Sequence, residues 1–209
     1  MFETYVIAFT TFFATVGPLD VAGMFAVLTP ASRSSARRAM AIRGTAIATL
    51  ILVVFALFGN LILHSLGISL AALKVAGGIL LLLMSIEMVF ARSSGGNSTT
   101  LEEADEASTK GDISVFPLAT PLIAGPGAMG AAILLMAKTD GMLIEQALVF
   151  AGLFTVMAMT LVLLLLAEKV PRFLGVTGMH VISRVFGVLL SALAVQFIFD
   201  GIVQSGIFA

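Results

Sequence analysis

The chain has 209 residues, of which 59% are hydrophobic and 11% are charged, and its mean hydropathy is +1.13. A soluble domain of this size could not bury so much apolar surface, so the composition predicts an integral membrane protein. The net charge of −1 gives no indication of nucleic-acid binding, and the absence of cysteine excludes disulfides and thiolate metal sites.

Six apolar segments follow one another along the chain, and each is long enough to cross a hydrocarbon layer about 30 Å thick as a helix. The segments are continuously apolar rather than alternating, which favours helices over barrel strands. The first lacks the basic residues of a cleavable signal peptide, so we expect it to be retained. The expected spans are 4–29, 44–63, 68–91, 113–137, 146–167 and 181–206.

The basic residues are concentrated in alternate connections, and this distribution predicts the orientation of the chain. Nine of them lie in the connections that follow the first, third and fifth spans, whereas the other connections contain only Lys74 and Lys138. Cytoplasmic connections carry the excess of Lys and Arg, so we expect both termini on the non-cytoplasmic side of a cell (inner) membrane. The nine basic residues are Arg33, Arg37, Arg38, Arg43, Arg92, Lys110, Lys169, Arg172 and Arg184.

The two halves of the sequence contain an internal repeat. The pair Gly17-Pro18 recurs 108 positions later as Gly125-Pro126, and the same offset maps 66–69 onto 174–177. The shared offset predicts two related three-helix repeats, 1–92 and 113–209. Because three is an odd number of spans, the second repeat enters the membrane from the opposite side, and the repeats are inverted.

The segment 93–112 between the repeats is polar and acidic, and we interpret it as a flexible cytoplasmic linker. A cation-binding role for its acidic cluster is the alternative. The fold expected from these observations is an all-α membrane protein with six transmembrane helices, arranged as two inverted three-helix repeats.

Each repeat has a proline near the middle of its first span, Pro18 in one and Pro126 in the other. A proline inside a helix removes one backbone donor and clashes with the preceding turn. We therefore expect helices 1 and 4 to be broken near mid-membrane, with a plain proline kink as the alternative. Backbone groups freed at that depth have to be satisfied by protein, water or a ligand.

The residues at these breaks form the predicted substrate site. Asp20 is the only charged residue of its span, and an intramembrane carboxylate is by default a functional group. We expect Asp20 to contact a coupling ion or a substrate ammonium group, and the backbone beyond Gly125 to bind a substrate carboxylate. The predicted substrate-binding residues are Gly17, Pro18, Asp20, Thr120, Gly125, Pro126, Gly127 and Ala128.

Three stretches of the chain resemble the MarC family of six-span inner-membrane proteins. The most specific is PLATPLIAGPGAM at 117–129, and the stretches 76–87 and 58–63 are also similar to the family. The resemblance implies a membrane protein related to transporters of small neutral amino acids. The first span departs from the family pattern, because Asp20 and Val21 stand where Gly and often Asn are typical, and Gly23 replaces a second Pro.

These observations predict a secondary transporter of small neutral amino acids, such as alanine or glycine, that works by alternating access coupled to Na⁺ or H⁺. The alternatives are an exporter of another small metabolite or drug and a non-transporting scaffold or regulatory protein. No catalytic triad, zinc-protease or phosphate-loop motif is present, so we expect no enzyme activity and no cofactor. The expected partners are the small-molecule substrate and membrane lipid, and the close-packing glycines permit a homo-oligomer without requiring one.

Overall fold

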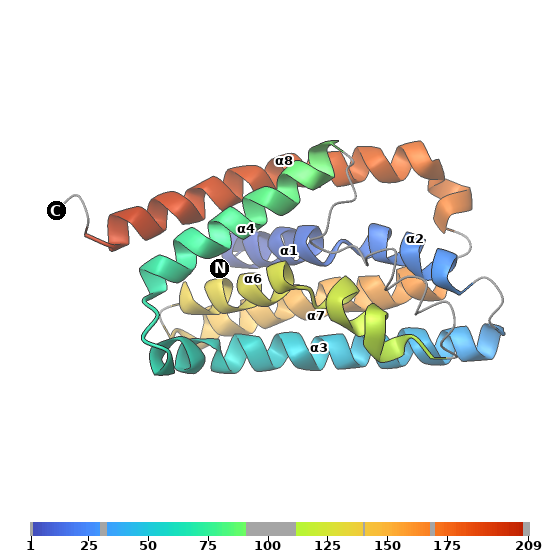
Figure 1. The fold of residues 1–209 in the computed structure, drawn as a ribbon, viewed down its shortest axis with the longest axis horizontal. Coiled ribbons are helices and arrows are strands. Elements are labelled where there is room, and N and C mark those ends of the chain that lie inside the picture. Colours follow the sequence, from blue (N-terminus) through green and yellow to red (C-terminus); the bar gives the residue numbers. More distant parts are fainter. Residues whose placement is uncertain (1, 30–32, 91–111, 140, 168–169, 207–209) are drawn as a thin grey trace.

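The computed structural model describes residues 2–29, 33–90, 112–139, 141–167 and 170–206, and these residues fold into helices joined by short turns (Figure 1). One element, η1, is a π-helix, in which the hydrogen bonds are spaced more widely than in an α-helix. In chain order the elements are α1 (Phe2–Val16), α2 (Pro18–Leu28), α3 (Ser34–Ser65), α4 (Leu70–Phe90), η1 (Ser114–Ile123), α6 (Pro126–Ala137), α7 (Leu143–Leu165) and α8 (Val170–Gln204).

The described helices include five segments that are long and apolar enough to cross a membrane. The consecutive elements η1 and α6 pass the same test as a pair that is bent by 56°, which raises the number of candidate spans to six. The all-helical membrane fold is thereby confirmed, and the bent pair coincides with the fourth expected span. The linker 93–111 lies outside the described residues.

Two helices begin well before the spans expected from the apolar runs. Helix α3 starts at Ser34 instead of residue 44, and α8 starts at Val170 instead of residue 181. The uncharged apolar run of α3 begins after Arg43, but arginine, alanine and methionine are good helix formers, and the helix includes them. At 1.5 Å per residue, the 32 residues of α3 extend about 48 Å, beyond the hydrocarbon layer.

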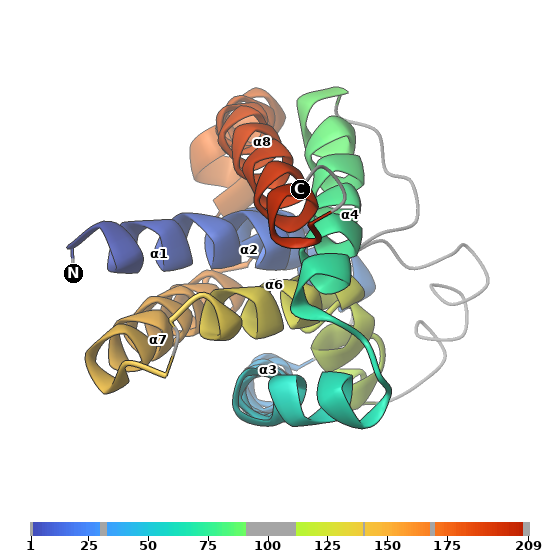
Figure 2. The same cartoon turned by 90° about the vertical axis from the view of Figure 1, so that its left-hand side faces the viewer.

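Helices α4 and α8 form a closely packed pair along one side of the molecule (Figure 2). A Cβ atom on Gly78 would lie 2.7 Å from the carbonyl oxygen of Ala194, and one on Gly201 would lie 2.8 Å from that of Ala71. Side chains do not fit between the two backbones at these positions. Glycine therefore allows the helices to approach as closely as small-residue motifs do in membranes.

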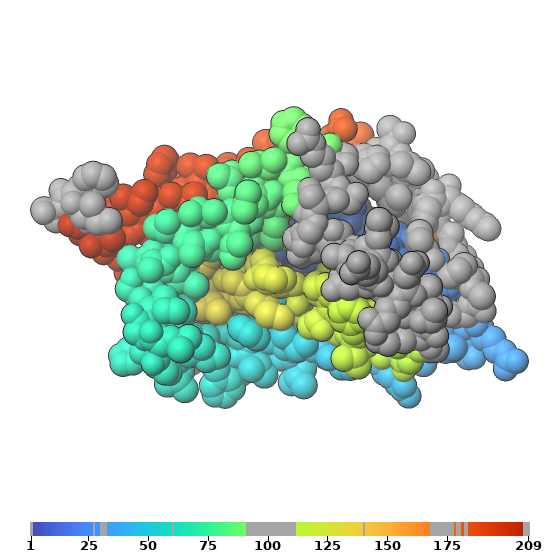
Figure 3. Space-filling model, viewed as in Figure 1, coloured from blue at the N-terminus to red at the C-terminus, as the bar shows by residue number. Residues whose placement is uncertain are grey.

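Helix α6 is the most enclosed element of the described structure. Every residue from Ala131 to Ala137 is buried, and α6 packs against α1, α3 and α4. Figure 3 shows its partly exposed side as the narrow yellow band between α4 and α3. Gly127 and Ala128 in the first turn of α6 are also buried. This helix therefore carries the second Gly-Pro pair into the protein core.

Polar contacts mark the two ends of the bundle. At one end Lys138 of α6 lies 3.8 Å from Asp200 of α8, and the Lys74 ammonium donates to the Gln204 side chain at 2.8 Å. The N-terminal end of α1 also points toward this end (Figure 1). The opposite end holds the beginning of α3 with its arginines and the end of α7. The two helix breaks lie between these two ends of the bundle (Figure 1).

Candidate functional site at the two helix breaks

The first break consists of one left-handed residue between two helices. Gly17 has φ 60° and ψ 56°, a conformation that favours glycine, and it ends α1 by donating its N–H to the Phe13 carbonyl at 3.0 Å. Pro18 then begins α2, in the position where a missing backbone N–H does least harm. The Gly17 carbonyl accepts from the Val21 N–H at 2.9 Å. The local sequence thus ends one helix and starts another within two residues.

Asp20 lies in the first turn of α2 and turns back toward the break. Its Oδ2 atom lies 3.5 Å from the position that a Cβ on Gly17 would occupy. The side chain is exposed, whereas its neighbours Leu19 and Val21 are buried. A carboxylate in the first helical turn lies at the positive end of the helix dipole.

The second break is longer and more irregular than the first. Within η1, Phe116 and Thr120 have extended rather than helical backbone angles, and each precedes a proline in a cis peptide bond. The backbone hydrogen bonds here join residues five apart, as in a π-helix. The Leu118 N–H donates to the Ile113 carbonyl at 3.1 Å, and the Ala124 N–H donates to the Ala119 carbonyl at 2.8 Å. The expectation of a broken fourth helix is confirmed.

Helix α6 starts directly after this segment, in the protein interior. Gly125 is its N-cap residue and has an extended backbone with φ −78° and ψ 169°. The N–H groups of Gly127 and Ala128 are in the first turn and therefore have no acceptor within the helix. Gly125 has no side chain that could cap them. Pro126 is exposed, but Gly127 and Ala128 are buried. The interior end of α6 thus presents two donors and a partial positive charge.

The structure brings the two breaks to the same level of the bundle. Both lie near the middle of its length (Figure 1), and the elements that carry them are in contact, α1 with α6 and α2 with η1. The predicted residues of the first break, 17–20, are close together, as are those of the second break, 125–128. Thr120 is one turn earlier in η1, and its hydroxyl donates to the Val115 carbonyl at 3.5 Å.

Buried residues that sequence reasoning missed complete the surroundings of the breaks. Thr11 and Thr15 are fully buried on α1, and their hydroxyls donate to the carbonyls of Ile7 and Thr11 at 2.7 and 2.9 Å. Both are polar residues inside an apolar span, which is the signal that could have identified them. Met84 of α4 fills the space beside Gly127, and a contact between distant helices leaves no such signal in the sequence.

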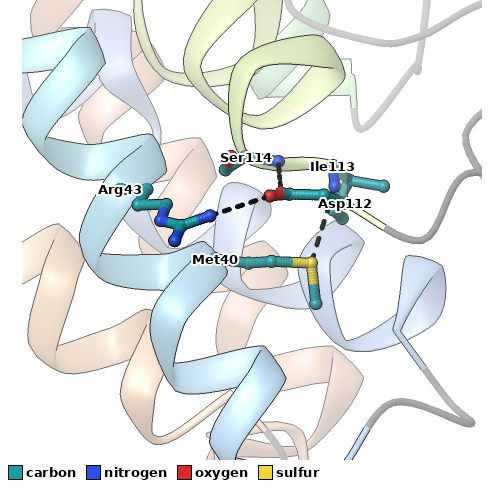
Figure 4. Close-up of polar contacts among 5 residues, drawn as sticks. All are labelled: Met40, Arg43, Asp112, Ile113 and Ser114. Carbon is teal, nitrogen blue, oxygen red and sulfur yellow. Dashed lines mark hydrogen bonds and ion pairs between the residues drawn. The ribbon is translucent and has the colours of Figure 1, made fainter.

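Three polar contacts hold the beginning of η1, and two of them join it to α3 (Figure 4). The Asp112 carboxylate accepts from the Ser114 N–H at 2.9 Å and pairs with the Arg43 guanidinium at 3.2 Å. The Ile113 N–H points to the Met40 sulfur at 3.5 Å. The hydrogen bond from the Ser114 backbone, helped by Arg43, lowers the pKa of Asp112 below its usual value of 3.8. Asp112, which the sequence predicts to lie in the flexible linker, thus caps the beginning of η1, away from the Gly125-Pro126 pair.

The two breaks offer polar groups that could bind charged ligands. The Asp20 carboxylate provides oxygen atoms suited to a cation, and the start of α6 provides donors suited to an anion. Within the described part of the chain, no group of three His, Asp or Glu side chains could hold a metal ion.

The chain matches the MarC family of integral membrane proteins over residues 2–205. It belongs to the MarC family. A UPF0056 membrane protein of Methanocaldococcus jannaschii is 37% identical over 200 residues, which cover 96% of either chain. YvbG of Bacillus subtilis is 34% identical over 97% of this chain and 95% of its own. YhcE of Escherichia coli is 31% identical over 99% of this chain and 94% of its own.

These relatives are described as membrane proteins, and no solved structure matches the chain. The resemblance found in the motifs at 58–63, 76–87 and 117–129 is confirmed over nearly the whole length. This MarC family member is accordingly a multi-pass integral membrane protein.

Proposed function

We propose that this MarC family member is a secondary transporter of small neutral amino acids, such as alanine or glycine. The observation that carries the proposal is that a carboxylate at one break and backbone donors at the other lie at the same level of the bundle. The buried start of α6 provides donors for a substrate carboxylate, and Asp20 at the other break provides a carboxylate for Na⁺, H⁺ or the substrate ammonium group. A zwitterionic amino acid needs both.

The alternating-access mechanism rests on two inverted halves, and the packing partners of the helices support this arrangement. In the first half, α1 and α2 pack against α7, while in the second half η1 and α6 pack against α3. The last helices of the halves, α4 and α8, pack against each other. A two-fold axis in the membrane plane would exchange these pairs, as expected for inverted repeats that move relative to each other.

The surroundings of the site favour a small substrate. The start of α6 is formed by Gly127 and Ala128, and the sulfur of Met84 lies against it. We therefore place alanine and glycine ahead of larger metabolites as substrates.

Transport is tested by reconstituting the full chain into liposomes and measuring uptake of labelled alanine and glycine under imposed Na⁺ or H⁺ gradients. We expect gradient-dependent uptake by the wild type and loss of the gradient dependence in Asp20→Asn. The matched control is Asp112→Asn, which makes the same chemical change outside the breaks and should keep the coupling. Absence of uptake in every gradient would refute the transport proposal, whereas unchanged coupling in Asp20→Asn would refute only the role of Asp20.

The proposed orientation places both termini outside the cytoplasm, and it can be tested separately because the chain contains no cysteine. Ser205→Cys and Arg33→Cys introduce single thiols at opposite ends of the bundle. In intact cells a membrane-impermeant maleimide should label Cys at 205 and should reach Cys at 33 only after permeabilisation. The reverse labelling pattern would invert the proposed topology.

A further inference from the structure

A cavity of about 300 Å³ lies between the beginning of α3 and the end of α7, far along the bundle from the breaks. One wall is polar and is formed by Ser34, Arg37 and Arg38, and the other is formed by the backbone and side chains of 164–167. The described lining residues carry two positive charges and no carboxylate. Glu168 and Lys169, which follow the apolar wall, lie outside the described residues.

The two arginines of the cavity have different local roles. Arg37 is partly buried and donates to the backbone carbonyl of Thr29 at the end of α2. Arg38 is exposed, and within the described part of the chain its side chain forms no ion pair or hydrogen bond. An arginine fork of this kind is suited to binding the oxygens of a phosphate.

The position of the cavity along the bundle indicates what reaches it. It lies at the ends of two candidate membrane spans, Ser34–Gly59 and Leu143–Leu165, which is where lipid headgroups meet the hydrocarbon layer. The side chains of Leu165 and Leu166 beside it are 44% and 41% exposed. An apolar surface thus continues from the charged wall toward the lipid tails.

We propose that this cavity binds the headgroup of an anionic phospholipid. The phosphate contacts Arg37 and Arg38, the glycerol fills the cavity, and the acyl chains lie outside along the exposed leucines of α7. A free phosphate ion would use the arginines but not the apolar wall, which is why a lipid is the better occupant. Basic pockets between membrane helices bind anionic headgroups in this manner. The site is independent of transport and of the two breaks.

The test measures lipid binding to the purified full chain by native mass spectrometry in micelles that contain phosphatidylglycerol or, for comparison, phosphatidylcholine. We expect one tightly bound phosphatidylglycerol per chain and binding roughly five- to tenfold weaker in Arg38→Ala. Arg33→Ala is the matched control, because Arg33 is an exposed arginine of the same cluster that does not line the cavity. It should bind like the wild type, and Arg38→Lys should retain part of the binding.

Three results would overturn the proposal. Equal binding of phosphatidylglycerol and phosphatidylcholine would show that the charge of the headgroup does not matter. Equal losses in Arg38→Ala and Arg33→Ala would assign the effect to the net charge of this surface and not to the cavity. Displacement of the lipid by millimolar inorganic phosphate or glycerol 3-phosphate would identify a soluble phosphate compound as the occupant.

Discussion

The two Gly-Pro pairs begin from the same dipeptide and produce different structures. At the first, Gly17 is left-handed and hydrogen-bonded to both helices, and 2–26 remains one candidate span. At the second, Gly125 is extended, and the pair that it joins is bent by 56°. The dipeptide therefore determines where a helix ends, while the residues before it determine how far the axis turns.

The preceding residues explain the difference physically. Before Gly17 the sequence is an uninterrupted run of helix-compatible residues, so α1 reaches the break with a regular ladder. Before Gly125 stand Pro117 and Pro121, each preceded by an extended residue, and the chain enters the break through a π-helix. At the first break the chain thus continues as a single candidate span, whereas at the second it bends and has to be packed by the surrounding helices.

The largest effect that we expect at either break follows from Gly127→Ala. The new Cβ would overlap the Met84 sulfur, so α4 or the methionine has to shift, at a cost of about 1–3 kcal/mol in unfolding free energy. Reversible unfolding in mixed micelles measures this loss. In the Met84→Ala background Gly127→Ala should cost less than it does in the wild type, and equal costs in the two backgrounds would contradict the contact.

A smaller effect is expected at the first break from Gly17→Ala. The space there is adequate, because the added Cβ would meet the Asp20 carboxylate at 3.5 Å, an ordinary contact. Only the left-handed backbone opposes the change, by about 1–2 kcal/mol. Gly23→Ala is the control, since nothing lies within 4 Å of its added Cβ and its φ is not positive. A loss no greater than that of the control would argue against the left-handed cap.

The smallest effect concerns the Asp112 cap at the beginning of η1. The pKa of Asp112 is lowered in the folded protein, so its contribution to stability is complete above about pH 5 and is lost as the pH falls below 3.8 through the folded pKa. The Asp112 side chain is 49% exposed, so we expect Asp112→Asn to cost less than about 1 kcal/mol, or a few degrees in Tm. Circular dichroism melts at pH 7 and pH 3 should show a smaller difference at pH 3 than at pH 7.

Much of the fold could be predicted from the sequence because membrane spans and helix breaks depend on local residue patterns. Six apolar runs and the two Gly-Pro pairs were sufficient to locate the spans and both breaks. The early starts of α3 and α8 could not be predicted from the apolar runs, because a charged residue interrupts an apolar run but does not end a helix. The contact of Met84 with Gly127, and the pairing of Asp112 with Arg43, join residues far apart in the chain and depend on the packed structure.

The bent pair η1–α6 has a consequence for how the protein enters the membrane. Helix α6 has 12 residues, about 18 Å at 1.5 Å per residue, and cannot cross the hydrocarbon layer alone. The irregular backbone before it cannot face lipid either, because its polar groups need partners. The translocon therefore cannot release this segment as an independent span. It has to be received by helices that are already inserted, and its packed neighbours α1, α2, α3 and α4 all precede it in the chain.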